Sequence, residues 1–89
     1  IKGEGDSMEP SFMEGDNLLI NKNINEIKAG GGIFAINWNK MTLVKRLQMN
    51  PQTDEIIIKS DNPNYDSIVV KPNEIKIEGK VIWYGRELR

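Results

Sequence analysis

The chain has 89 residues, 38% of them hydrophobic and 28% charged, and a formal net charge of −1. A chain of this length forms one small domain, which we expect over residues 1–89, and its near-neutral charge argues against a nucleic-acid-binding surface, which needs a basic face. It contains neither cysteine nor histidine, so disulfides and the commonest metal ligands are excluded, and we predict no metal and no cofactor.

Short β-branched runs separated by turn residues are typical of an all-β domain. In chain order, we expect strands near 18–21, 33–36, 41–49, 56–58, 67–70, 75–77 and 81–84. Only the segment from Ser7 to Met13 resembles a helical turn, with Ser7 as its N-cap.

The longest apolar runs hold three or four residues, at 18–20 and 81–84, whereas crossing a bilayer takes roughly 20. We therefore predict no membrane segment and a cytoplasmic location. The chain begins Ile1-Lys2-Gly3, without an initiator methionine, so we expect it to be a piece of a longer protein.

Lys45 lies in the apolar stretch Leu43-Val44-Lys45-Arg46-Leu47. If this stretch is a strand, Lys45 shares a face with large apolar residues, and Arg46 points to the other face. A lysine among apolar groups loses hydration of its charged form, which lowers its pKa and suits it to act as a general base. The alternative is a lysine at the rim of the sheet, whose stem covers apolar surface while its ammonium group reaches water.

Ser7 lies in the string Gly5-Asp6-Ser7-Met8-Glu9-Pro10. A serine before a short helical turn is ordinarily a cap. The functional alternative places its hydroxyl at a sharp turn, beside backbone N–H groups that could stabilise an oxyanion. In a chain without histidine or cysteine, a serine activated by a neutral lysine is the one nucleophilic pair that the composition still allows.

Several strings occur together in order. They are Gly5 to Pro10, Gly15-Asp16, Val44-Lys45-Arg46-Leu47, Ser60-Asp61-Asn62-Pro63-Asn64-Tyr65 and Gly79-Lys80-Val81-Ile82-Trp83-Tyr84-Gly85-Arg86. With them the sequence resembles, over nearly its whole length, the LexA/UmuD-type peptidase domain found at the C-terminus of LexA and of many phage repressors. The family more often has arginine where Lys80 stands. The resemblance implies a compact, mostly β domain of short, twisted, largely antiparallel strands with one short helical turn after Ser7.

The resemblance also implies that Ser7 is the nucleophile and Lys45 the general base of a Ser-Lys dyad. We expect Asp6 and Met8 beside them to shape the site and its oxyanion-stabilising backbone. Four further residues are expected to support it: Gly5, Pro10, Asp61 and Asn62. Asparagine and aspartate before proline are natural turn formers, so we favour a bracing turn at 61–62 over a third catalytic group.

The segment 81–84 carries apolar residues on both faces, and strict alternation would pair Val81 with Trp83 and Ile82 with Tyr84. That pattern fits a doubly covered central strand and a strand pressed against a partner equally well. Because the family dimerises along C-terminal strands, the resemblance favours a homodimer interface formed by Val81, Ile82, Trp83 and Tyr84.

Two parts of the family pattern lie outside the chain. In self-cleaving members the scissile bond lies a few dozen residues before the nucleophile, and repressors carry an N-terminal helix-turn-helix that binds DNA. The Ala29-Gly30 pair follows the nucleophile in a glycine-rich turn, so we interpret it as the start of a strand and not as a substrate.

We therefore expect the C-terminal regulatory domain of a LexA-like or phage-type transcriptional repressor, which dimerises and cuts its own upstream linker by Ser7/Lys45 chemistry, as in the SOS response. Its partners would be a second copy, that linker, a RecA-type co-protease as a candidate trigger, and DNA only through the missing N-terminal domain. The alternative is a non-catalytic dimerisation module. A signal-peptidase-like processing enzyme ranks behind both, because nothing in the sequence supplies a membrane anchor.

Overall fold

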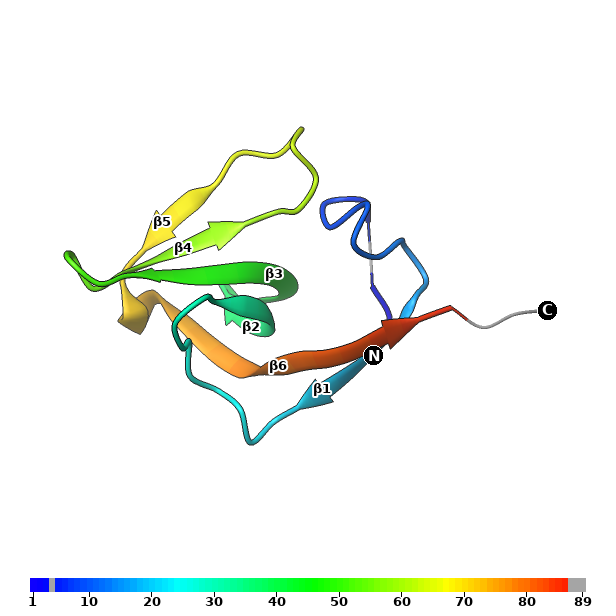
Figure 1. Ribbon diagram of the computed structural model, residues 1–89, viewed down its shortest axis with the longest axis horizontal. Coiled ribbons are helices and arrows are strands. Elements are labelled where there is room, and N and C mark those ends of the chain that lie inside the picture. The colour runs from blue at the N-terminus through cyan, green and yellow to red at the C-terminus, as the bar shows by residue number, and fades with distance from the viewer. Residues whose placement is uncertain (4, 87–89) are drawn as a thin grey trace.

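The computed structural model describes residues 1–3 and 5–86, and it confirms the predicted mostly β fold (Figure 1). The two predicted strands at 75–77 and 81–84 are one continuous strand. In the described part of the chain, no helix is long and apolar enough to span a membrane. The elements are β1 (Asn17–Asn21), β2 (Gly32–Trp38), β3 (Met41–Asn50), β4 (Glu55–Lys59), β5 (Ile68–Val70), the 3-10 helix η1 (Pro72–Glu74) and β6 (Ile75–Gly85).

The strands form one six-stranded sheet in the order β1-β6-β2-β3-β4-β5, and all neighbours in it are antiparallel. The long strand β6 pairs with two strands, first with β2 and then with β1. Its first half pairs with β2, as far as Lys80 opposite Phe34, and its second half pairs with β1, from Lys80 to Gly85. The second half of β6 therefore has a strand partner on one side only among the described residues.

The β2–β3 hairpin sets the register of the strand that carries Lys45. Its two turn residues, Asn39 and Lys40, both have positive φ angles, of 50° and 64°, as two-residue hairpin turns of the tight, primed type require. The turn joins Trp38 directly to Met41, and counting along the ladder places Lys45 opposite Phe34. Paired residues share a face of the sheet, so Lys45 lies on the face of Phe34.

Hydrophobic residues pack on both faces of the sheet, as the alternation along β2 shows: Phe34 and Ile36 belong to one cluster and Ile33 to another. Each fully buried large apolar side chain contributes roughly 1.5–3 kcal/mol. Cluster 1 consists of Phe34, Ile36, Leu47, Ile56, Ile58 and Val70, with Leu43 packed against it. Cluster 2 consists of Met8, Phe12, Leu18, Ile33 and Val81, with Ile20 and Val44 packed against it.

A β-bulge in β6 makes the strict alternation predicted for 81–84 wrong. The ladder with β1 pairs Leu19 with Trp83 but Ile20 with Val81, which leaves Ile82 as an extra residue. A bulge of this kind moves the following side chains to the opposite face. Val81 and Tyr84 therefore share the face of cluster 2, and Trp83 lies on the other face.

The segment after Ser7 forms consecutive turns. The N–H of Phe12 donates to the carbonyl of Met8 at 3.3 Å, and the N–H of Ser11 donates to the same oxygen at 2.9 Å. This is one turn of helical spacing, and among the described residues the regular 3-10 helix is η1. Met8 and Phe12 are buried in cluster 2. Their packing holds the loop that carries Ser7, called the Ser7 loop below, against the sheet.

Candidate active site

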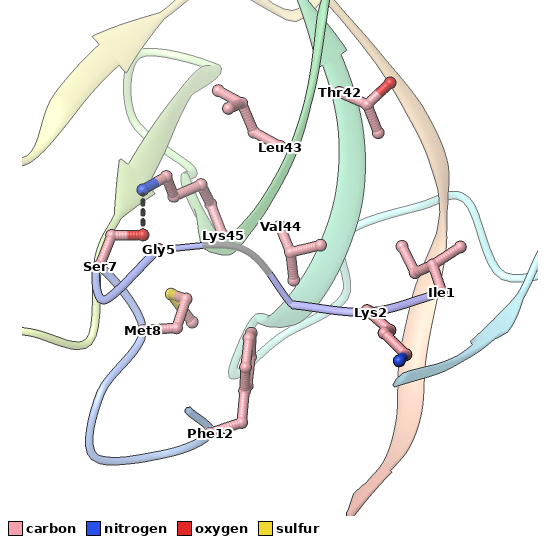
Figure 2. Close-up of a pocket in the computed structure, with 10 residues that line it drawn as sticks. All are labelled: Ile1, Lys2, Gly5, Ser7, Met8, Phe12, Thr42, Leu43, Val44 and Lys45. Atoms are coloured by element: carbon pink, nitrogen blue, oxygen red, sulfur yellow. Dashed lines mark hydrogen bonds between the residues drawn. The ribbon is translucent and has the colours of Figure 1, made fainter. Parts of the chain in front are cut away.

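Ser7 and Lys45 meet although they lie 38 positions apart in the chain. The Lys45 Nζ donates a hydrogen bond to the Ser7 Oγ at 2.8 Å. In Figure 2 the Lys45 side chain leaves β3 toward the Ser7 loop, and the Ser7 hydroxyl points toward its amine. The hydroxyl of Ser7 thus contacts a candidate base, as a serine nucleophile requires.

Burial alters the acid–base behaviour of Lys45. The side chain is partly buried, and it shares the face of Phe34. Loss of hydration lowers the pKa of the Lys45 amine below its ordinary value. The ring of Tyr65 lies 5.7 Å from the Nζ, but no carboxylate of the described residues forms an ion pair with it. The amine is therefore easier to deprotonate than that of a surface lysine.

A second loop, at residues 60–65, holds the Ser7 loop in place. The backbone N–H of Asn62 donates to the carbonyl of Ser7 at 2.9 Å, and the Asn62 Nδ2 donates to the carbonyl of Asp6 at 3.0 Å. The hydroxyl of Tyr65 donates to the Asp6 carboxylate, and this bond raises the pKa of the Tyr65 phenol. Figure 1 shows the two loops facing each other beside β3 and β4.

Asp61 anchors that second loop to β3. The Arg46 Nε and Nη2 donate to its two carboxylate oxygens at 2.7 and 2.9 Å, and the hydroxyl of Ser11 also donates to it. These bonds lower the pKa of the Asp61 carboxyl, chiefly through Arg46, and Asp61 raises the pKa of Arg46. A planar, two-point pair of this kind fixes geometry as well as charge.

The remaining predicted residues surround the dyad in different ways. Gly5 has a φ of 72°, a conformation that L side chains rarely adopt, so glycine suits this turn. Met8 is buried in cluster 2, and its Sδ lies 3.5 Å from the N–H of Asp61. Asp6 is exposed and bonded through Tyr65, and Pro10 is exposed in the turn that follows Ser7. Their roles in the chemistry stay predictions.

Two site residues were not predicted individually, although both lie in the quoted string 60–65. Tyr65 contacts the site through Asp6, and the hydroxyl of Ser60 accepts a second hydrogen bond from the Lys45 Nζ, at 2.9 Å. The turn at 51–54 pairs Asn50 with Glu55, and continuing that register places Ser60 opposite Lys45. The hairpin length in the sequence was the signal that could have found Ser60.

A cleft of about 590 Å³ opens beside the dyad. Figure 2 shows that the N-terminal segment forms one wall and β3 the other, with Ser7 and Lys45 at one end. Apolar side chains dominate the lining, among them Ile1, Met8, Phe12, Leu43 and Val44.

The end of β6 forms an exposed apolar surface. Trp83 is 56% exposed, and Ile82, Tyr84 and the neighbouring Leu19 on β1 are also largely exposed. Val81 differs, because it is 8% exposed and belongs to cluster 2 within the single chain. Of the four residues predicted for an interface, three are therefore available to a partner.

This end of β6 also contacts the base of the Ser7 loop. The ring of Tyr84 lies 5.7 Å from that of Phe12. The Arg86 Nε donates to the buried Asp16 carboxylate at 3.0 Å. The pKa of Asp16 is lowered, first by a hydrogen bond from the backbone of Met13 and then by Arg86.

Two comparisons with known proteins show which family the chain belongs to. A family model described as "Peptidase S24-like" matches residues 1–82. The chain is also 32% identical over 81 residues to the repressor protein CI of Enterobacteria phage phi80, an alignment that covers 91% of this chain and 34% of the relative. The chain thus spans about a third of the length of that repressor. A match over nearly the whole chain shows that the protein belongs to the Peptidase S24-like family.

Proposed function

We propose that this domain is the regulatory part of a LexA-like or phage-type transcriptional repressor, and that Ser7 and Lys45 cut the linker that precedes the domain. The observation that carries the proposal is the 2.8 Å contact between the Ser7 hydroxyl and a lysine amine whose pKa is lowered by burial. The relative that matches the chain is named a repressor, which supports this biological setting.

In the proposed reaction, the neutral Lys45 amine takes the proton of the Ser7 hydroxyl as the Ser7 Oγ attacks the carbonyl carbon of the scissile bond. The tetrahedral intermediate collapses, the C–N bond breaks, and the Lys45 ammonium donates its proton to the leaving amine. Water then hydrolyses the Ser7 ester with Lys45 again acting as base. The backbone N–H groups of Ser7 and Met8 make no hydrogen bond to residues 1–3 or 5–86, and we propose that they stabilise the oxyanion.

A linker from the same chain is a suitable substrate for such a site. Attachment to the domain gives the linker a high effective concentration in the cleft, which compensates for a modest catalyst. Cleavage would separate the dimerising domain from a DNA-binding region and remove the gain from two-site DNA binding.

The cleavage test uses the full-length protein with its upstream region, incubated at neutral and alkaline pH and followed by gel electrophoresis and mass spectrometry. We expect two fragments, formed faster at alkaline pH because Lys45 is then neutral. Ser7→Ala and Lys45→Ala should abolish the fragments, and Ser67→Ala, a matched change of an exposed serine, should not. Cleavage that persists in the dyad variants, or no cleavage in the parent, would favour the non-catalytic dimerisation module.

We also propose that the exposed end of β6 forms the interface of a homodimer. Ile82, Trp83 and Tyr84 are each close to half exposed or more, and large apolar side chains exposed together at one end of a strand are typical of protein–protein contacts. The described residues place no strand beside the second half of β6 on the side away from β1. A second copy could pair with that free edge and cover exposed side chains on both faces of β6 beside it.

Analytical ultracentrifugation of the chain over a range of concentrations tests the dimer. We expect Trp83→Lys to weaken association by at least about tenfold, because it puts a charge into an apolar contact. The matched control is Val69→Lys, at an equally exposed position on β5, and it should leave association unchanged. A parent that sediments as a monomer at high concentration would contradict the interface.

A further inference from the structure

The Lys45 amine makes two hydrogen bonds, and only the one to Ser7 belongs to the proposed dyad. Its Nζ also donates to the Oγ of Ser60 at 2.9 Å. Ser60 follows β4 directly, and the β3–β4 register pairs Arg46 with Lys59, so the next residue along lies opposite Lys45 and on its face of the sheet. The side chain is partly buried. Ser60 therefore contacts the candidate base Lys45, and it makes no hydrogen bond to Ser7 among the described residues.

We propose that Ser60 is a positioning residue of the dyad, whose hydroxyl holds the Lys45 amine so that the nitrogen lone pair faces the hydroxyl proton of Ser7. This inference rests on the proposed function and assigns it a third residue. Ser7 precedes Lys45 in the chain and lies in the N-terminal loop, whereas Ser60 follows Lys45 and lies at the end of β4.

The physical reason lies in the shape of a neutral amine. Such an amine has one lone pair and two N–H bonds, and it rotates freely about the Cε–Nζ bond unless a partner fixes it. An N–H of Lys45 that stays bonded to Ser60 restricts this rotation and directs the lone pair to the other partner, which is Ser7. Proton transfer needs this alignment as well as a short distance.

A hydroxyl suits this role better than a carboxylate. A carboxylate next to Lys45 would favour the ammonium form and raise the pKa of the base. Around the amine, Asp6 is held by Tyr65, and Asp61 is held by Arg46 on the other face of β3. β2 contributes the apolar Phe34. Ser60 thus fixes the direction of the amine without adding charge to its surroundings.

The test measures how fast Ser7 reacts with a fluorophosphonate probe as a function of pH, read by mass spectrometry of the Ser7 peptide. The Ser7 Oγ forms a bond to phosphorus, the P–F bond breaks, fluoride leaves, and Lys45 takes the hydroxyl proton. The alkaline plateau of the rate reports how well the neutral amine is aligned. The midpoint of the profile reports the pKa of Lys45. A loss of packing alone would lower the plateau and leave the midpoint in place.

In Ser60→Ala we expect a plateau about tenfold lower, the size of one lost hydrogen bond. We also expect the midpoint to move toward acid by roughly half a pH unit, since the ammonium form loses an acceptor. Ser60→Thr should restore both values because it keeps the hydroxyl. Ser60→Cys, which keeps the size but accepts hydrogen bonds weakly, should resemble the alanine variant. Ser67→Ala should behave as the parent.

An unchanged plateau and midpoint in folded Ser60→Ala and Ser60→Cys would overturn the role of Ser60 and leave the dyad intact. A lower plateau with an unmoved midpoint would overturn it as well, in favour of packing. A parent whose Ser7 does not react at any pH would overturn the dyad and Ser60 together. If Ser7 reacts as expected but the full-length protein never cuts its linker, the proposed function fails and the positioning role stands.

Discussion

Two neighbouring cations on β3 have opposite surroundings. Lys45 lies on the face of Phe34 and is bonded to two neutral hydroxyls, and burial lowers its pKa. Arg46, on the other face, makes a two-point pair with Asp61 that raises its pKa. One strand therefore holds a cation that can lose its proton and a cation that cannot. The difference separates a chemical role from a structural one, although the two side chains are adjacent in sequence.

The first way to break this contrast is to make the Lys45 position as permanently charged as its neighbour. In Lys45→Arg the guanidinium cannot be deprotonated at any pH that the protein survives. We expect linker cleavage in the full-length protein to fall by at least about 100-fold across the whole pH range, the usual contribution of a general base. The matched change Lys22→Arg, in an exposed turn, should leave the rate unchanged. A Lys45→Arg protein that still cleaves faster at alkaline pH would show that another group is the base.

The second prediction concerns the structural member of the pair. Asp61→Asn removes the charge that Arg46 and Ser11 contact. We expect the free energy of unfolding at neutral pH to fall by about 1–2 kcal/mol, below the usual value for a charged hydrogen-bonded pair because the Arg46 side chain is 37% exposed. Urea unfolding measures the change. Exposed Asp54→Gly, at a turn residue with a φ of 61°, is a control for charge loss without a partner and should not be destabilising.

Acid should remove the difference in the free energy of unfolding between the parent and Asp61→Asn. Because the pKa of Asp61 is lowered in the folded chain, the unfolded chain binds a proton first as the pH falls below the ordinary value of about 3.9. The stability that Asp61 contributes is complete above that value and is lost as the pH falls through the lowered folded pKa. Parent and Asp61→Asn should therefore converge in strong acid. A gap that stays constant with pH would mean that the pair contributes no charge-dependent stability.

The sequence predicted the contrast between Lys45 and Arg46, but it predicted only part of the contacts around these two residues. Strand alternation separated Lys45 from Arg46, because period-two patterning needs only local information. The bulge at Ile82 was not predicted, since a β-bulge depends on the strands that flank it and has no signal in four apolar residues. The contacts of Asp6 with Tyr65 and of Lys45 with Ser60 join distant segments. Pairing of that kind follows from the sheet register, which the sequence fixes only once the partner strands are known.

The smallest expected effect is a gain in stability from removing the unpaired cation. Lys45→Met keeps the length and apolar stem but no charge, so folding no longer desolvates an ammonium group. We expect the free energy of unfolding to rise by roughly 0.5 kcal/mol at neutral pH, within the range of partly exposed substitutions. Cleavage should be lost at the same time, because the base is gone.

The pH dependence of that gain has a definite sign. The lowered pKa of Lys45 means that, between its folded value and the ordinary value of about 10.4, the unfolded chain holds more protons than the folded one. The stability of the parent therefore rises with pH in this window, and the advantage of Lys45→Met shrinks as Lys45 becomes neutral. Urea unfolding of both proteins at neutral and alkaline pH, with exposed Lys22→Met as the control, measures the convergence. A Lys45→Met advantage that persists unchanged into alkali would mean that packing, and not the buried charge, separates Lys45 from its neighbour Arg46.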